Sequence, residues 1–143
     1  MTEPIAITRQ GQVRGVEKAG LLNFRGIPFV APPVGPLRFR APEPPEPWDG
    51  IRDATQNGPI SLQAPPSLDL PGGPAAQRPM AEDCLTLNVW APATSGALPV
   101  MVWIHGGGFQ IGSGSSPIYQ GDAFARDGVV FVSLNYRLGE LGF

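Results

Sequence analysis

Three hydrophobic runs in the second half of the chain predict β-strands. The run CLTLNVWAP (84–92) alternates apolar and polar residues, which is typical of a strand with one buried face. The runs LPVMVWI (98–104) and GVVFVSLNY (128–136) are almost continuously apolar and rich in β-branched residues. Such runs predict strands that are buried on both faces of a sheet.

The segment SPIYQGDAFARDG (116–128) predicts a short helix between the last two strands. Ser116 is a helix-capping residue type, Pro117 suits a first helical turn, and Gly128 suits the position just after a helix end. A strand, a helix and a second strand in this order form a βαβ unit. We therefore expect an α/β fold.

The first half of the chain has a different pattern. Residues 12–16 and 21–25 predict two short strands of a small β-hairpin, joined by a turn at 18–20. Prolines recur from residue 28 to residue 48, and the apolar residues among them favour an ordered, packed loop over the alternative of a solvated linker. A second Pro- and Gly-rich segment, 64–80, predicts a mobile loop.

Composition and charge narrow the class of protein. The 143 residues have the length of one ordinary domain, and 42% hydrophobic with 15% charged residues indicates a folded chain, although 19 glycines and 18 prolines make it rich in loops. The net charge of −2 has no concentrated block, so we expect no nucleic-acid or membrane partner. No run is long enough to cross a membrane, and the N-terminus lacks the pattern of a signal peptide, so we expect a cytoplasmic location.

A histidine and three glycines follow the predicted strand 98–104, in the stretch IHGGGFQIGSG (104–114). Loops at the carboxyl ends of strands form the ligand sites of open α/β sheets. Glycine allows backbone N–H groups to approach a ligand closely, and converging N–H donors stabilise the negative charge that develops on a carbonyl oxygen in acyl transfer. The triplet by itself would fit a plain flexible loop about as well.

Four stretches together make the pattern specific: GIPFVAPPVGPLRF, AEDCLTLNVWAP, VMVWIHGGGFQIGS and VVFVSLNYRLGELGF. In this order and context they resemble the type-B carboxylesterase and cholinesterase family, from about Gly11 to Phe143. The resemblance implies an α/β-hydrolase fold, of which this chain would hold the N-terminal part: the small β-hairpin, then strands of the central mixed sheet. It also implies a serine nucleophile with glutamate and histidine partners, hydrolysis of small-molecule carboxylic esters, and no cofactor or metal.

The resemblance assigns roles to individual residues. Gly107 and Gly108 correspond to the oxyanion-hole donors through their backbone N–H groups, and Gly106 to the residue that shapes the turn before them. Phe109 corresponds to a wall of the substrate cleft, with a place in the core as the alternative. The residues Arg38 and Glu82 correspond to a structural ion pair, with solvated surface charges as the alternative.

The resemblance also bears on the roles of His105 and Cys84. Because family members can carry an aromatic residue at position 105, a positioning or packing role for His105 is favoured over a catalytic one. Cys84 is the only cysteine, and in secreted members it pairs with a cysteine at the position that corresponds to Ser61 here. We therefore expect no disulfide, and Cys84 lacks a visible basic activator that would make it a nucleophile.

The sequence contains no Gly-x-Ser-x-Gly, and His105 is its only histidine. We therefore expect residues 1–143 to be a partial domain that stops before the nucleophile elbow, inactive alone and poorly soluble because the strand at 128–136 would be left uncovered. Two hypotheses stay open: part of a carboxylesterase, or a non-catalytic esterase-like binding or adhesion protein or gene remnant. The intact glycine triplet favours the first, and oligomeric state is left open.

Overall fold

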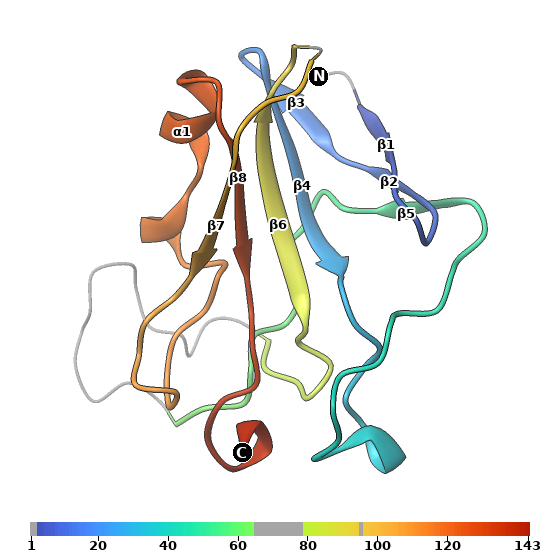
Figure 1. The fold of residues 1–143 in the computed structure, drawn as a ribbon, viewed down its shortest axis with the longest axis vertical. Coiled ribbons are helices and arrows are strands. Elements are labelled where there is room, and N and C mark those ends of the chain that lie inside the picture. Colours follow the sequence, from blue (N-terminus) through green and yellow to red (C-terminus); the bar gives the residue numbers. More distant parts are fainter. Residues whose placement is uncertain (1–2, 65–78, 95) are drawn as a thin grey trace.

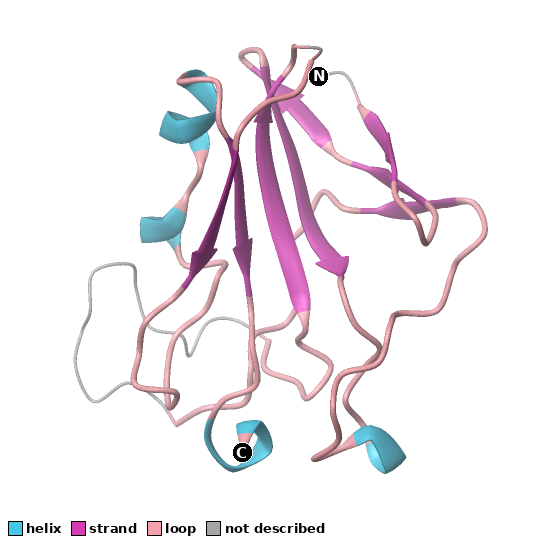
Figure 2. Cartoon of the chain, viewed as in Figure 1, coloured by secondary structure: helices cyan, strands magenta, loops and turns pink. Residues whose placement is uncertain are grey.

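The computed structural model describes residues 3–64, 79–94 and 96–143, whose strands form two sheets (Figures 1 and 2). The larger sheet has the order β3 (Val16–Lys18), β4 (Leu21–Pro28), β6 (Thr86–Pro92), β8 (Val130–Leu134) and β7 (Val100–Ile104). The smaller has the order β1 (Ile5–Ile7), β2 (Gln12–Arg14) and β5 (Ile51–Asp53). One α-helix, α1 (Asp122–Arg126), and short 3-10 turns at Gly35–Leu37, Pro117–Tyr119 and Gly139–Gly142 complete the described elements. Most of the segment 64–80, for which a mobile loop was predicted, lies outside the described residues.

The larger sheet is mixed. Strands β7 and β8 pair in parallel, from Val100 opposite Val130 to Ile104 opposite Leu134, while the other pairs are antiparallel. Helix α1 lies in the connection between β7 and β8, so the predicted βαβ unit is present. The structure is therefore α/β, with few helices and an incomplete set of elements.

The helix is shorter than the sequence pattern suggests. Ser116 precedes a 3-10 turn, and α1 begins separately after Gly121. Gly121, between the 3-10 turn and α1, is buried against Phe131, where a Cβ would lie 2.5 Å from the ring, so the chain passes close to the sheet at this point. Gly128 follows the helix end with φ +81°, in the role predicted for it.

The predicted hairpin forms, but with different boundaries. The expected first strand is interrupted at Gly15, so that it divides into β2 in the smaller sheet and β3 in the larger one. A Cβ at Gly15 would lie 2.5 Å from the carbonyl oxygen of Asn23, and this close crossing of β4 explains the break. The turn between β3 and β4 contains Ala19 (φ 52°) and Gly20 (φ 73°), two left-handed residues as in the common two-residue hairpin turn.

Two hydrophobic clusters hold these elements together. Val13, Phe24 and Ala54 join the two sheets, and Trp48 packs against them while its Nε1–H donates to the Gln12 carbonyl oxygen at 2.9 Å. The proline-rich loop is thus ordered and packed at Trp48, as predicted. The second cluster consists of Trp90, Ala125 and Phe131, between the larger sheet and α1.

Strand β7 differs from its prediction, because it is not buried on both faces. It lies at the edge of the larger sheet, and Val100, Val102 and Ile104 are more than half exposed. Met101 packs against the α1 cluster, so by strand alternation the exposed residues point to the opposite face. The prediction of an uncovered strand at 128–136 is also wrong in its location, since β8 has a neighbour on each side and the open apolar edge belongs to β7.

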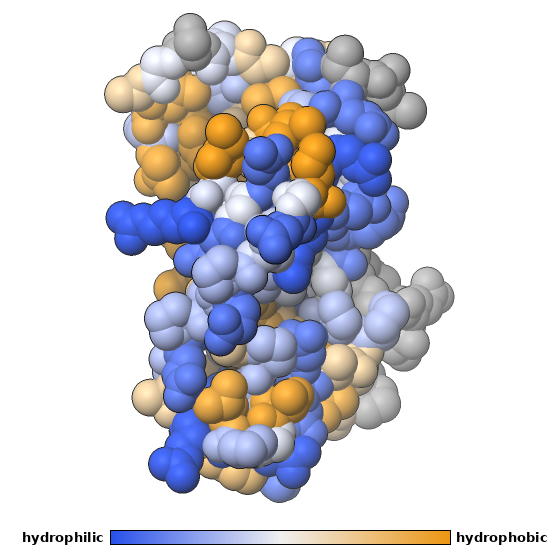
Figure 3. Space-filling model, turned by 90° about the vertical axis from the view of Figure 1, so that its right-hand side faces the viewer, coloured by the Kyte–Doolittle hydropathy of each residue, from blue (hydrophilic) through white to orange (hydrophobic). Residues whose placement is uncertain are grey.

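The side of the molecule that carries the smaller sheet is mixed in character. Figure 3 shows hydrophobic residues on this side in an upper and a lower group, with hydrophilic residues between them. The exposed large hydrophobic residues of the smaller sheet are Ile5, Ile7 and Ile51. We place the functional site elsewhere, at the end of the larger sheet to which β7 and β8 point.

Candidate functional site

The carboxyl ends of β7 and β8 lie side by side, and the loops that follow them meet at one end of the molecule (Figure 1). Two hydrogen bonds join these loops. The Tyr136 hydroxyl donates to the His105 carbonyl oxygen at 2.6 Å, and the Gly139 N–H donates to the Phe109 carbonyl oxygen at 2.7 Å. The glycine-rich loop therefore rests on the segment after β8.

The backbone of this loop requires glycine at two of the three triplet positions. Gly107 has φ +133°, and a Cβ there would overlap the carbonyl oxygen of Ile111. That close approach belongs to a tight turn, in which the N–H groups of Gln110 and Ile111 donate to the Gly107 carbonyl oxygen at 3.1 and 3.2 Å. Gly108 has φ +62°, a left-handed value, with open space around it. Gly106 has neither a positive φ nor a neighbour within 4 Å of a Cβ, so the structure gives no steric reason for glycine there.

The N–H groups of the triplet are not used to hold the fold. Gly106, Gly107 and Gly108 are exposed, and no backbone or side-chain acceptor within residues 3–64, 79–94 and 96–143 receives a hydrogen bond from their N–H groups. Adjacent unpaired N–H donors on a fixed turn are suited to binding an anionic oxygen.

His105, at the start of the loop, is a packed residue. Its ring is buried and stacks on Tyr136 with a centroid separation of 4.3 Å. Its Nδ1–H donates to the Gly106 carbonyl oxygen at 2.9 Å, which fixes the tautomer in this contact. Burial lowers the pKa of His105 below the ordinary histidine value, so the ring is neutral near pH 7. These contacts suit the positioning role that was favoured for it.

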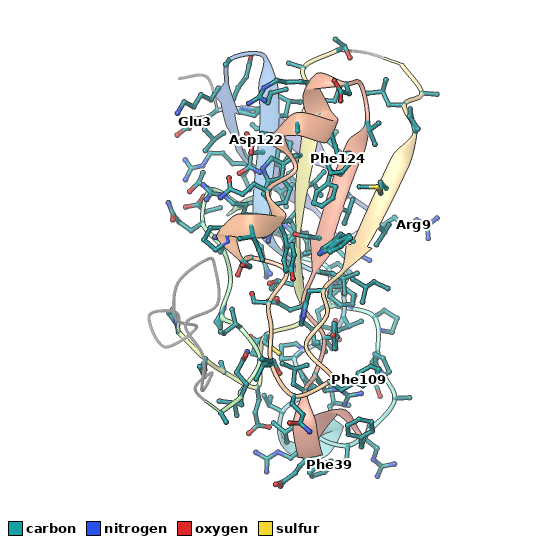
Figure 4. All side chains as sticks on the ribbon, turned by 90° about the vertical axis from the view of Figure 1, so that its left-hand side faces the viewer. Glu3, Arg9, Phe39, Phe109, Asp122 and Phe124 are labelled. Carbon is teal, nitrogen blue, oxygen red and sulfur yellow. The ribbon has the colours of Figure 1, made fainter. Side chains whose placement is uncertain are left out.

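Phe109 follows the triplet and lies on the surface. It has φ +60° and is 60% exposed, so it is not a core residue. Its ring meets Tyr136 and Phe143 edge to face, with centroids 6.3 and 6.0 Å away. Figure 4 shows Phe109 at the lower end of the molecule, toward Phe39. An exposed aromatic group thus borders the glycine loop.

Two of the three serines in the GSGSS stretch, Ser113 and Ser115, belong to a buried hydrogen-bond network. Ser113 Oγ lies 2.7 Å from Ser115 Oγ and 3.3 Å from Asn135 Oδ1, which also accepts from the Gly114 N–H at 2.9 Å. The Asn135 amide donates in turn to the carbonyl oxygens of Pro59 and Cys84 at 3.1 and 3.2 Å. Both hydroxyl groups are buried, so neither is placed to attack a substrate.

The sequence analysis did not identify Asn135 and Tyr136 as site residues. The signal for them was present in the last two residues of the run GVVFVSLNY, because an amide and a phenol directly after a buried strand must find partners at its carboxyl end. The sequence analysis also missed Gln63, because no local pattern marks this residue. Its side chain contacts Gly112, at the far end of the loop.

Arg38 and Glu82 form a bidentate ion pair across 44 positions of sequence. Arg38 Nε donates to Glu82 Oε2 at 2.7 Å, and Nη2 contacts Oε1. The side chains are 46% and 22% exposed, so the pair is only partly buried, and both residues line a small pocket. The pairing lowers the pKa of the Glu82 carboxyl group and raises the pKa of Arg38. It ties the proline-rich loop to the segment before β6.

Cys84 is buried, and it lines the same pocket beside Ser61. Burial raises the pKa of its thiol, so the nucleophilic thiolate is disfavoured. Ser61 Oγ accepts a hydrogen bond from the Leu138 N–H at 3.1 Å. The two positions that the sequence analysis paired are therefore neighbours, one as a serine and one as a free thiol.

The described part of the chain lacks a candidate metal site and a candidate membrane-spanning helix. No group of three or more His, Cys, Asp or Glu side chains there could hold a metal ion. No described helix has the length and hydrophobicity needed to cross a membrane.

Comparison with known proteins gives consistent matches. A family model described as "Carboxylesterase family" matches residues 2–143. Phenmedipham hydrolase of Pseudarthrobacter oxydans is 50% identical over all of this chain and 30% of its own length. Para-nitrobenzyl esterase of Bacillus subtilis is 49% identical over all of this chain and 29% of its own. The crystal structure of a Geobacillus stearothermophilus carboxylesterase superposes with a TM-score of 0.85 at 47% identity, over 97% of this chain and 27% of that one. The chain thus spans the N-terminal third or less of the relatives it matches.

Proposed function

Because the chain belongs to the carboxylesterase family, we propose that residues 1–143 are the N-terminal part of a serine carboxylesterase and carry its oxyanion-hole loop. One observation supports this proposal most strongly. The N–H groups of Gly107 and Gly108 lie on a turn of fixed shape, at the carboxyl end of a parallel strand, with no acceptor in the described part of the chain. A binding or adhesion module would not need such donors.

The proposed chemistry uses these donors in the transition state. When a serine hydroxyl attacks the carbonyl carbon of an ester, the carbonyl oxygen becomes an oxyanion, and two or more N–H donors stabilise it. Gly107 and Gly108 supply these donors, and Gly106 shapes the turn that precedes them. The charge is stabilised without reorganisation, because the Gly107 turn is already formed.

The remaining catalytic groups must come from outside these residues. Ser113 and Ser115 are committed to the Asn135 network, and His105 uses Nδ1 to bind the Gly106 carbonyl oxygen. The proposal therefore places the serine, glutamate and histidine in the part of the enzyme that the relatives have beyond this match. Residues 1–143 alone are expected to hydrolyse no ester.

The proposed substrate is a small-molecule carboxylic ester. Phe109 and Phe143 are exposed aromatic residues beside the glycine loop, and they suit the apolar part of such an ester. The name of one relative, para-nitrobenzyl esterase, describes an ester with an aromatic group as its substrate.

A chimera tests the proposal. It joins residues 1–143 to the part of the Bacillus subtilis para-nitrobenzyl esterase that follows its matched segment. We expect this chimera to hydrolyse para-nitrophenyl acetate, and a second chimera without the nucleophilic serine of the esterase portion to be inactive. A chimera that folds cooperatively but has no turnover would contradict the proposal and favour a non-catalytic protein.

A further inference from the structure

We infer that Gln63 is a positioning residue for the glycine loop, an inference that rests on the proposed function of that loop. The loop runs from His105 to Gly112, and its N–H donors at positions 106–108 have no protein partner within the described residues. Their direction therefore depends on how the two ends of the loop are held. Different side chains hold the two ends.

Gln63 holds the far end through both groups of its amide. Its Oε1 accepts from the Gly112 N–H at 2.8 Å, and its Nε2 donates to the Gly112 carbonyl oxygen at 2.9 Å. The same Nε2 donates to the Ser61 carbonyl oxygen at 3.1 Å, which fixes the plane of the amide. A side chain 49 positions away thus satisfies the backbone of Gly112 in the way that a paired strand would.

Tyr136 holds the near end. Its hydroxyl donates to the His105 carbonyl oxygen, and its ring stacks on the His105 ring. The two ends also touch each other, because a Cβ at Gly112 would overlap the His105 ring and lie 2.6 Å from the Gly106 carbonyl oxygen. Displacing Gly112 from Gln63 would therefore move the peptide groups that lead into the donors.

The geometry predicts an effect on catalysis more than on substrate binding. Gln63 is half-buried, and its hydrogen-bond partners are the backbone groups of Ser61 and Gly112, so it acts on the reaction through the loop. A displacement of about 1 Å in a catalytic group lowers rates by about 100-fold. Because the donors act on the charged transition state, the loss falls on kcat, while KM stays nearly unchanged.

The test compares three variants of the chimera. Gln63→Met keeps the side-chain length and removes all three hydrogen bonds of the amide. Gln63→Glu keeps the acceptor for the Gly112 N–H, and Gln120→Met is the matched control at an exposed position. We expect Gln63→Met to lower kcat by about 10- to 100-fold with KM within about threefold, and Gln120→Met to match the parent. Gln63→Glu should fall between them and approach the parent as the pH is lowered, because a protonated carboxyl group can again donate to the Gly112 carbonyl oxygen.

Amide hydrogen exchange of residues 105–112 in the chimera gives a readout that does not need activity. Faster exchange at Gly112 in Gln63→Met than in Gln120→Met supports the inference even if the parent chimera has no turnover, which would contradict only the proposed function. Equal kcat in Gln63→Met and Gln120→Met, or equal exchange at Gly112, would overturn the inference. If Gln63→Met does not fold, a Gln63→Glu variant whose kcat does not depend on carboxyl protonation would overturn it equally.

Discussion

Alanine substitutions along the glycine triplet should have unequal effects, because the three backbones differ. Gly106 has open space and no positive φ, so Gly106→Ala should change kcat by about twofold or less, as surface substitutions do. Gly108 has φ +62°, and a left-handed alanine costs about 1–2 kcal/mol, or about 5- to 30-fold if the whole cost appears in kcat. Gly107 combines φ +133° with overlap of the new methyl group and the Ile111 carbonyl oxygen. Its loop must rearrange, which should cost as much as losing one oxyanion donor, about 100- to 1,000-fold in kcat.

The assay is steady-state hydrolysis of para-nitrophenyl acetate by the chimera and its three alanine variants, with thermal unfolding as the control for folding. We expect the loss in kcat to increase in the order Gly106→Ala, Gly108→Ala, Gly107→Ala. Equal losses at all three positions would refute the conformational reasoning. Parental kcat in a folded Gly107→Ala variant would refute the oxyanion role itself.

Three further predictions concern the residues around the loop. Ser61→Cys should form a disulfide with Cys84 under oxidising conditions. Closing a loop of this length stabilises the folded state by about 3 kcal/mol, from which about 1 kcal/mol is lost with the hydrogen bond to Leu138. An unchanged urea midpoint would contradict this prediction. Glu82→Gln should lower the urea midpoint, and by less in 1 M salt, because salt screens the ion pair with Arg38. The difference in stability between parent and variant should disappear as the pH falls through the lowered pKa of Glu82. A loss that does not depend on salt would indicate a packing effect instead. Stability should also fall as the pH drops below about 6.5, because the unfolded chain takes up a proton on His105 before the folded chain does, and His105→Phe should flatten the slope that begins there.

Local patterns predicted much of the fold. The runs at 98–104 and 128–136 became β7 and β8, since continuous hydrophobicity and β-branched residues are properties of the segment itself. The division of the first predicted strand at Gly15 was missed, because it depends on β4 crossing close to that glycine. The exposure of β7 was missed for a related reason. An apolar run shows that a strand prefers burial, but its neighbours decide whether it lies at an edge.

The candidate site was only partly predictable. The glycine triplet and its chemistry could be read from the sequence, yet the steric demand at Gly107 and the lack of one at Gly106 depend on the turn to Ile111. The role inferred for Gln63 rests on a partner 49 positions away, and no periodicity connects the two. The family resemblance predicted the ion pair between Arg38 and Glu82, but the partial exposure of the two side chains could be seen only in the structure.

The most direct measurement of the central claim follows the glycine N–H groups during catalysis. A trifluoromethyl ketone forms a stable hemiketal oxyanion with a serine esterase, and ¹⁵N-glycine labelling of the chimera reports the amide protons of Gly107 and Gly108. The account predicts that both amide resonances move downfield when the inhibitor binds, as the N–H groups begin to donate to the oxyanion. Covalent inhibition that leaves both resonances in place would contradict the claim that this loop is the oxyanion hole.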